Sequence, residues 1–320
     1  MRTATLDRIL AVLVVAMAGT GLLALRSGAI AASWVFTIHG LVGGVLLLAT
    51  LVKARRSLPP AIRAGHTSAV VISLVVAVAI AGALIGGYLW VASGRLLAIG
   101  PWTLLSWHAW FGLALVPLVV IHLLPRRWRV LRPPTRGGVS RRTVLVTGGL
   151  AVAGVAAFGA TAVLERLLGG TRRFTGSRLL PPGSIPPATT FYGEPAPAID
   201  VRAWRLHVDG RPLSLDELRA IGEVEVTEVL DCTSGWAVET TWRGVPLRSV
   251  IEIPASGSVR VRSVTGWSTI LDADEARLAL LATAVGGVPL PLLNGAPCRL
   301  VVPGRRGLDW VKWVDEVSLA

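Results

Sequence analysis

The chain has 320 residues, a formal net charge of +13 and 52% hydrophobic residues, but only 16% charged ones. Its mean hydropathy of +0.63 is too high for an ordinary soluble protein, so part of the chain is expected to lie in a lipid bilayer. Residues 1–142 hold 15 Lys and Arg against one acid, Asp7, whereas residues 143–320 hold 17 against 18. Charge distributed in this way reports membrane orientation, so no nucleic-acid partner is expected.

Five apolar stretches are long enough to span a bilayer, which takes about 20 residues. They lie at about 8–25, 34–52, 66–91, 103–124 and 143–165. Positive residues gather before the first stretch and in segments 53–63 and 126–142, whereas the other links carry only Arg26 and Arg95. The positive-inside rule predicts a multi-pass cell-membrane protein with a cytoplasmic N-terminus and an extracytoplasmic domain beyond about residue 168.

The membrane part is expected to form an all-α transmembrane bundle of about five helices. Residues 1–130 would make a four-helix domain, and residues 131–168 a basic loop with the fifth helix. Residues 169–200 are dense in Pro and Gly, which predicts a linker that partly wraps the next domain. Residues 201–320 change to short β-branched runs between Gly and Pro turns, which predicts a compact, β-rich α+β domain.

Strands and two short helices are predicted within this second domain. The strand candidates are AWRLHVDG, EVEVTEVLD, SVRVRSV and CRLVVPG, at residues 203–210, 223–231, 258–264 and 298–304. One helix is predicted at SLDELRAI, residues 214–221, with Ser214 as its N-cap, and another at DADEARLALLATA, residues 272–284.

Four of the five histidines lie in the membrane part, where ionisable side chains are functional candidates by default. His39 and His108 each lie five residues inside the outer end of a span, and His66 and His122 lie at inner ends. Since 14 residues, about 40° short of four full turns, separate His108 from His122, both face nearly the same side of one helix. Two pairs at two depths predict two b haems with bis-histidine ligation, an outer one on His39 and His108 and an inner one on His66 and His122.

The alternative is that these histidines cap helix ends at the interface. Small residues beside them leave room for a flat macrocycle: Gly40, Gly43, Gly44, Gly65 and Gly112. Residues 1–130 also resemble the b-type haem subunits of membrane oxidoreductases, of the ferric-reductase-like and formate-dehydrogenase-like kinds.

The fifth apolar stretch begins with VSRRTVLVTGG, residues 139–149, which resembles a twin-arginine export signal. Export by that route carries folded proteins, which suits a domain that receives its cofactor in the cytoplasm. The alternative is that Arg141 and Arg142 are two more positive-inside residues. The triplet Ala160-Thr161-Ala162 would allow cleavage, but retention is expected because an attached haem domain is the more useful one.

The chain has two cysteines, Cys232 and Cys298, which are too few for a disulfide framework or a structural zinc site. Cys232 therefore acts alone or merely packs, as free cysteines often do. It stands in EVLDCTSGWAVETTWRGVPL, residues 228–247.

This stretch carries C-x-x-G-W-x5-W-x-G-x-P-L and is followed by VRVRSVTGW and GGVPLPLLNGAPCRLVVPGRRGLDWVKWVDEV. In this order the motifs resemble the molybdopterin domain of the sulfite oxidase family over about residues 188–320. The nearest resemblance within it is to catalytic subunits of protein-methionine-sulfoxide reductases. The resemblance implies Mo-molybdopterin as cofactor, with Cys232 as the protein thiolate on molybdenum and hence the catalytic residue; a soft thiolate suits such a metal.

The same resemblance implies seven further contacts to the cofactor. They are three groups for its phosphate and pterin, three lining it from the linker side, and one hydroxyl: Asn294, Arg299 and Lys312; Thr190, Phe191 and Tyr192; and Ser263. Arg299 and Lys312 have an alternative as surface salt-bridge partners. Cys298, at a variable position of the family, is expected in the core, and His207 is expected to be structural.

The expected function is electron transfer from quinol through two b haems to an outward-facing molybdenum centre that reduces a sulfoxide or N-oxide, small or protein-bound. Classical sulfite oxidases place arginines soon after the ligand cysteine and add a C-terminal dimerisation domain. Here TSGW follows Cys232 and the chain stops within seven residues of Trp313, which favours the reductase-like branch. Two rivals stay open: a sulfite-type oxidase that feeds the quinone pool, and a haem-only conduit with a cofactor-free binding domain.

Overall fold

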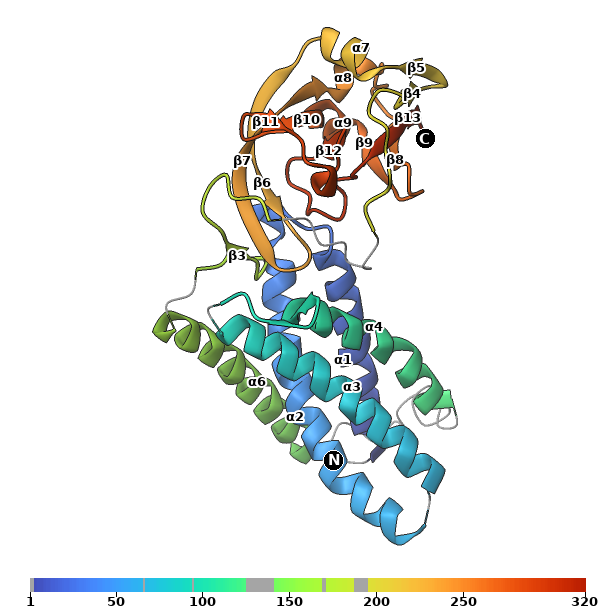
Figure 1. Cartoon of the computed structure of the whole chain (residues 1–320). Helices are drawn as coiled ribbons and strands as arrows, with labels where there is room; N and C mark the ends of the chain where they lie inside the picture. The colour runs from blue at the N-terminus through green and yellow to red at the C-terminus, as the bar shows by residue number, and fades with distance from the viewer. Residues whose placement is uncertain (1–2, 66, 94, 125–140, 169–170, 187–194) are drawn as a thin grey trace. The chain divides into compact units, whose positions relative to one another are not determined.

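The structure is a computed structural model that describes residues 3–65, 67–93, 95–124, 141–168, 171–186 and 195–320 (Figure 1). The chain divides into two compact units. The helical unit comprises residues 1–24 and 32–176, and the sheet unit comprises residues 25–31 and 177–320. The segment between the first two long helices is thus part of the sheet unit.

The described part of the helical unit contains five long helices. They are α1 Thr3–Ala24, α2 Ser33–Arg63, α3 Thr67–Ala92, α4 Leu104–Leu123 and α6 Arg141–Leu167 (Figure 1). Each is long and apolar enough to cross a membrane. The predicted helical N-terminal region is therefore confirmed.

Small residues allow two of these helices to approach closely. A side-chain carbon at Gly44 of α2 would lie 2.5 Å from the carbonyl oxygen of Gly154 of α6, so neither position accepts a larger residue without moving a backbone. Such contacts replace the hydrophobic drive that helices lose in lipid. Polar groups also join helices, because Lys53 of α2 forms an ion pair with the buried Asp7 of α1.

The sheet unit contains two sheets among its described residues. The first has the order β11-β10-β7-β3, with β6 also on β7 and β12 also on β10; the second has the order β5-β4-β13-β8-β9. The first sheet consists of β3 Arg178–Leu179, β6 Val224–Asp231, β7 Trp236–Pro246, β10 Leu280–Val285, β11 Val288–Pro289 and β12 Arg299–Val301. The second consists of β4 Leu206–Val208, β5 Arg211–Leu213, β8 Ser258–Ser263, β9 Ser268–Asp272 and β13 Val314–Leu319.

Two pairings position the parts of the candidate site. β6 and β7 form a long antiparallel hairpin, in register from Val224 opposite Gly244 to Asp231 opposite Ala237. β3 pairs in parallel with β7, so residues that follow Gly176 contribute an edge strand. One buried hydrophobic cluster spans the unit and includes Trp242 and Trp310, whose ring centroids lie 5.5 Å apart.

The predicted elements of this unit are confirmed with one correction. Four predicted strands contain β4, β6, β8 and β12, and the first predicted helix is α7 Leu215–Ala220, with Ser214 and Glu217 as a capping box. The predicted helix over residues 272–284 is wrong in its second half, because α9 Ala273–Leu278 ends and β10 follows. Every residue of β10 is buried between β7 and the β11 and β12 strands, and such strands carry the continuous apolar runs that resemble buried helix.

Candidate active site

Cys232 opens the tight turn between β6 and β7. The N–H of Gly235 donates to the carbonyl oxygen of Cys232 at 2.9 Å, and the N–H of Cys232 donates to that of Trp236 at 2.8 Å. Gly235 has a φ of 104°, which a residue with a side chain rarely adopts. The half-buried Sγ lies 2.9 Å from the hydroxyl oxygen of Ser234. The turn therefore holds a single thiol at the end of a strand.

A buried ion pair lies behind this turn. Nη2 of Arg306 lies 3.1 Å from Oδ1 of Asp231 and donates to the carbonyl oxygen of Cys232 at 3.2 Å. Ser177 donates its hydroxyl to the same Asp231 oxygen at 2.6 Å and accepts from Arg306 at 3.1 Å. Breaking a buried pair of this kind costs about 3–5 kcal/mol, because the remaining charge is left uncompensated. The network therefore fixes the backbone that carries the thiol.

Arg299 of β12 is a buried cation of the same region. Its guanidinium carbon lies 5.6 Å from the ring centroid of Trp242 and 6.0 Å from that of Trp310, and its Nη1 donates to the carbonyl oxygen of Asn294 at 2.9 Å. Burial lowers the pKa of Arg299 to about 10, and the negative charge of Cys232 acts in the opposite direction. Arg299 thus stays protonated at neutral pH and contributes positive charge near the thiol.

Asn294 and Lys312 lie beside Arg299 because two chain segments pack together. Asn294 ends a short 3-10 helix, Leu292–Asn294, and Gly295 follows with a φ of 112°. A side-chain carbon at Gly295 would lie 3.1 Å from Cα of Lys312 and 3.2 Å from Cβ of Arg299. Nζ of Lys312 lies 4.3 Å from the ring centroid of Trp313. The structure therefore brings Asn294, Arg299 and Lys312 together.

Ser263 lies at the end of β8, and its environment is that of a turn. Its hydroxyl oxygen accepts hydrogen bonds from the N–H and the hydroxyl of Thr265, at 3.2 and 3.1 Å. The next residue, Val264, donates its N–H to the carbonyl oxygen of Trp313 at 3.0 Å. Ser263 is thus next to the segment that carries Lys312, with its oxygen engaged in the β8–β9 turn.

The remaining predicted residues of this domain fall into three groups. Cys298 is fully buried in the hydrophobic cluster, and burial raises the pKa of its thiol. His207 is exposed on β4, with Nδ1 3.4 Å from the carbonyl oxygen of Asp315. The predicted linker contacts lie outside the described residues: Thr190, Phe191 and Tyr192.

The structure brings together one of the two predicted histidine pairs. The rings of His39 on α2 and His108 on α4 meet edge to face, with centroids 5.8 Å apart. Nδ1 of His39 lies 2.8 Å from the hydroxyl oxygen of Thr20, and Nδ1 of His108 lies 2.6 Å from the carbonyl oxygen of Ala83. Second-shell bonds of this kind orient metal-ligating histidines through their other nitrogen. His122 is half-buried on α4, and His66 lies outside the described residues.

Two buried atoms near Cys232 test whether the residues present fit a molybdopterin. Oδ1 of Asn294 and Nε of Arg299 have no hydrogen-bond partner among the described residues, and both side chains are 4% exposed. An unsatisfied buried polar atom costs about 1–3 kcal/mol, so a structure that leaves two of them is suited to a polar ligand. A pterin offers donors and acceptors, and its phosphate offers negative charge opposite an arginine. The residues fit the group.

Comparison with known proteins defines the class. Residues 193–320 match the family model of the oxidoreductase molybdopterin binding domain. The sheet unit therefore contains a molybdopterin-binding domain, and the chain is an oxidoreductase enzyme. No group of three or more His, Cys, Asp or Glu suited to a metal ion occurs within the described ranges, so a metal there would rest on few protein ligands.

The particular relatives are of two kinds. The chain is 36% identical over 149 residues to the protein-methionine-sulfoxide reductase catalytic subunit MsrP of Xanthomonas campestris, covering 38% of this chain and 46% of that protein. It is 31% identical over 188 residues to mitochondrial sulfite oxidase of Rattus norvegicus, covering 44% of this chain and 34% of that protein. The chain thus spans less than half the length of either relative.

A solved structure, the sulfane dehydrogenase SoxCD from Paracoccus pantotrophus, matches with a TM-score of 0.35 and 21% identity over 39% of this chain and 40% of that one. This likeness is too small to bear on the fold.

Sequence reasoning missed the residues that support Cys232. Ser177, Asp231 and Arg306 come from three separate segments and meet only in the folded unit. The available signal was the acid directly before Cys232 and the paired arginines of GRRGLDW. Trp242 and Trp310 lie in the quoted motifs, but their packing against Arg299 required the structure.

Proposed function

We propose that the chain is a membrane-anchored, molybdopterin-dependent oxidoreductase that takes electrons from quinol and reduces a sulfoxide or N-oxide. The observation that carries this proposal is the half-buried thiol of Cys232 in a turn fixed by a buried ion pair, near a buried arginine with an unsatisfied nitrogen. Bound Mo-molybdopterin supplies two-electron oxygen-atom transfer.

Each protein group has a defined part in this proposal. Cys232 gives the thiolate that holds the metal, since a soft anionic sulfur suits it. Arg299 and Asn294 hold polar atoms of the cofactor, and Lys312 adds positive charge for its phosphate. Arg306 fixes the turn through Asp231 and the Cys232 carbonyl group. Apart from Cys232, these residues bind and orient, and they exchange no electrons.

The reductive direction rests on the relative with the higher identity, which is named as a sulfoxide reductase. The sequence TSGW after Cys232 places no arginine beside the thiol, which also departs from the sulfite oxidase pattern. The match to sulfite oxidase keeps the oxidative direction as the rival.

Two b haems in the helical unit would deliver the electrons. His39 and His108 support the outer one because they face each other from two helices with Nδ1 engaged, which leaves Nε2 of each ring for a metal. His66 and His122 are proposed for the inner one on their sequence positions alone. A haem edge near the membrane surface is where a quinol partner would donate.

The proposed orientation is a cytoplasmic N-terminus with the sheet unit outside. It rests on the charge distribution and on five helices of spanning length. A reporter fused after residue 140 should be cytoplasmic and one after residue 200 external. Replacing both Arg141 and Arg142 by Lys should block export if they form a twin-arginine signal, whereas normal export would reduce them to topogenic charge.

Purified full-length protein decides between the candidate functions. We expect molybdenum near one atom per chain, oxidation of reduced viologen by methionine sulfoxide, free or in protein, and no ferricyanide reduction by sulfite. Sulfite-dependent ferricyanide reduction without sulfoxide reduction would establish the oxidase. Absence of molybdenum after expression in a host that makes the cofactor would leave the haem-only conduit.

A further inference from the structure

The segment that joins α1 to α2 docks on the loop between β12 and Trp310. Gly28 donates its N–H to the carbonyl oxygen of Gly304 at 3.1 Å, and Ser27 forms an isolated antiparallel bridge with Arg305. The carbonyl oxygen of Arg26 accepts from the N–H of Arg306 at 3.3 Å. Residues 25–31 thus run beside loop 304–309 as an added strand-like segment of the sheet unit.

Gly28 is buried at the centre of this contact, and the space around it admits no side chain. A side-chain carbon there would lie 2.8 Å from both the carbonyl carbon and the carbonyl oxygen of Arg305, and 3.0 Å from the oxygen of Gly304. These are backbone atoms, which cannot rotate away as a side chain can. Any larger residue at position 28 must therefore displace loop 304–309.

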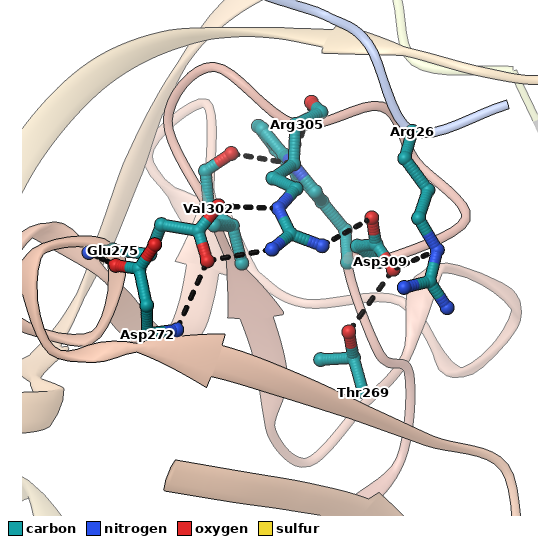
Figure 2. Close-up of polar contacts among 8 residues, drawn as sticks. Arg26, Thr269, Asp272, Glu275, Val302, Arg305 and Asp309 are labelled. Atoms are coloured by element: carbon teal, nitrogen blue, oxygen red, sulfur yellow. Dashed lines mark hydrogen bonds and ion pairs between the residues drawn. The ribbon is translucent and has the colours of Figure 1, made fainter. Parts of the chain in front are cut away.

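An ionic cluster holds the other side of the same loop (Figure 2). Arg305 forms a two-pronged pair with Glu275, at 2.5 and 2.6 Å, and a third contact with Asp309 at 3.1 Å. These acceptors raise the pKa of Arg305. Asp309 is 1% exposed and also accepts from Thr269 at 3.0 Å, and Nε of Arg26 approaches it at 3.6 Å. The loop is thus held by α9 and β9 on one side and by residues 25–31 on the other.

The same loop supports the Cys232 turn. Arg306, one residue beyond the Arg305 bridge, carries the guanidinium that binds Asp231 and the Cys232 carbonyl oxygen. Gly307 donates its N–H to the carbonyl oxygen of Asp231 at 2.8 Å. Two consecutive residues therefore contact the docked segment on one side and the thiol-bearing turn on the other.

We propose that residues 25–31 are a positioning element for the thiol of Cys232, acting through loop 304–309, with Gly28 and Arg26 as its positioning residues. The segment between two helices of the helical unit would thereby set how well the thiol is held in the sheet unit. This inference rests on the proposed function only in naming molybdenum as what the thiol binds.

The test uses the full chain in detergent, expressed in a host that cannot make molybdopterin, and measures the rate at which iodoacetamide alkylates each cysteine by mass spectrometry. Gly28→Val should raise the Cys232 rate about tenfold, because a loosened turn exposes a half-buried sulfur; tenfold corresponds to about 1.4 kcal/mol. Arg26→Ala removes a partly exposed ion pair and should raise the rate about twofold to threefold. Ile30→Ala is the matched control, since Ile30 is 80% exposed, and its rate should be unchanged.

Cys298 reports on the fold in each sample, because it is fully buried and should remain unmodified. An unchanged Cys232 rate in Gly28→Val with Cys298 protected would overturn the proposal. If Gly28→Val exposes Cys298, the variant has unfolded, and Arg26→Ala decides: an unchanged Cys232 rate there would overturn it equally. Molybdenum content of wild type from a competent host is measured alongside. A changed thiol rate without molybdenum leaves this inference standing without the proposed function, and molybdenum with unchanged thiol rates does the reverse.

Discussion

The helical unit and the sheet unit place their candidate functional groups in different ways. In the helical unit, His39 and His108 come from separate helices, and each relies on one hydrogen bond to orient its ring. In the sheet unit, the Cys232 turn relies on a buried network from Ser177, Asp231 and Arg306. The first arrangement depends on the identity of single ligands, whereas the second depends on contacts among distant segments.

The largest effect is expected from the thiol itself. Cys232→Ser should keep the fold and most of the bound pterin but lower turnover more than about 100-fold, beyond what loss of an outer-shell partner costs at a metal site. Viologen-linked sulfoxide reduction measures this. Cys298→Ser is the matched control and should cost only the about 1–3 kcal/mol of stability typical of a core polar substitution. Equal turnover losses in the two variants would remove the distinction between the cysteines.

Arg299→Met should have the next largest effect, on cofactor content. It keeps apolar bulk against Trp242 and Trp310 but removes the positive charge and the unsatisfied Nε. Loss of a charge-assisted contact worth about 1.5–3 kcal/mol predicts a tenfold or greater fall in cofactor affinity. Molybdenum per chain, measured at limiting cofactor supply, checks this. Full occupancy would mean that Arg299 is a structural cation.

His39→Ala sharpens the comparison from the side of the helical unit. It should remove the outer haem and abolish quinol-linked turnover while leaving molybdenum content and viologen-linked turnover within about twofold, because the sheet unit forms its own core. Haem spectra with two resolvable potentials in wild type and one in the variant are expected. Full haem content in His39→Ala and in His108→Ala would refute the pairing.

The long-range network explains what the sequence did and did not predict. The five apolar helices, the Ser214 capping box and the β6 and β8 strands follow from local periodicity and capping. The β10 strand was predicted as helix because a doubly covered strand loses its alternation. Cys232, Asn294, Arg299 and Lys312 were found through motifs. The Arg306 network and the docking of residues 25–31 require knowledge of which loops meet, which no local pattern encodes.

The smallest effect is expected at the edge of the sheet unit, at Asp315. Burial raises the pKa of this partly exposed carboxyl group, with a smaller opposing contribution from Arg262. A raised folded pKa gives stability that is present below the unfolded pKa and is lost as the pH rises through the folded one. Asp315→Asn should therefore be slightly more stable than wild type at pH 7, with the difference fading near pH 4. Thermal unfolding at the two pH values checks this, and a variant less stable at pH 7 would contradict it.

X-ray absorption at the molybdenum edge tests the central claim most directly, because it counts the sulfur atoms bound to the metal. We predict three in wild type, two in Cys232→Ser and three in Cys298→Ser, since one protein thiolate joins the two sulfurs of the pterin. Three sulfurs in Cys232→Ser, or the loss of one in Cys298→Ser, would contradict the assignment of Cys232 as the molybdenum ligand.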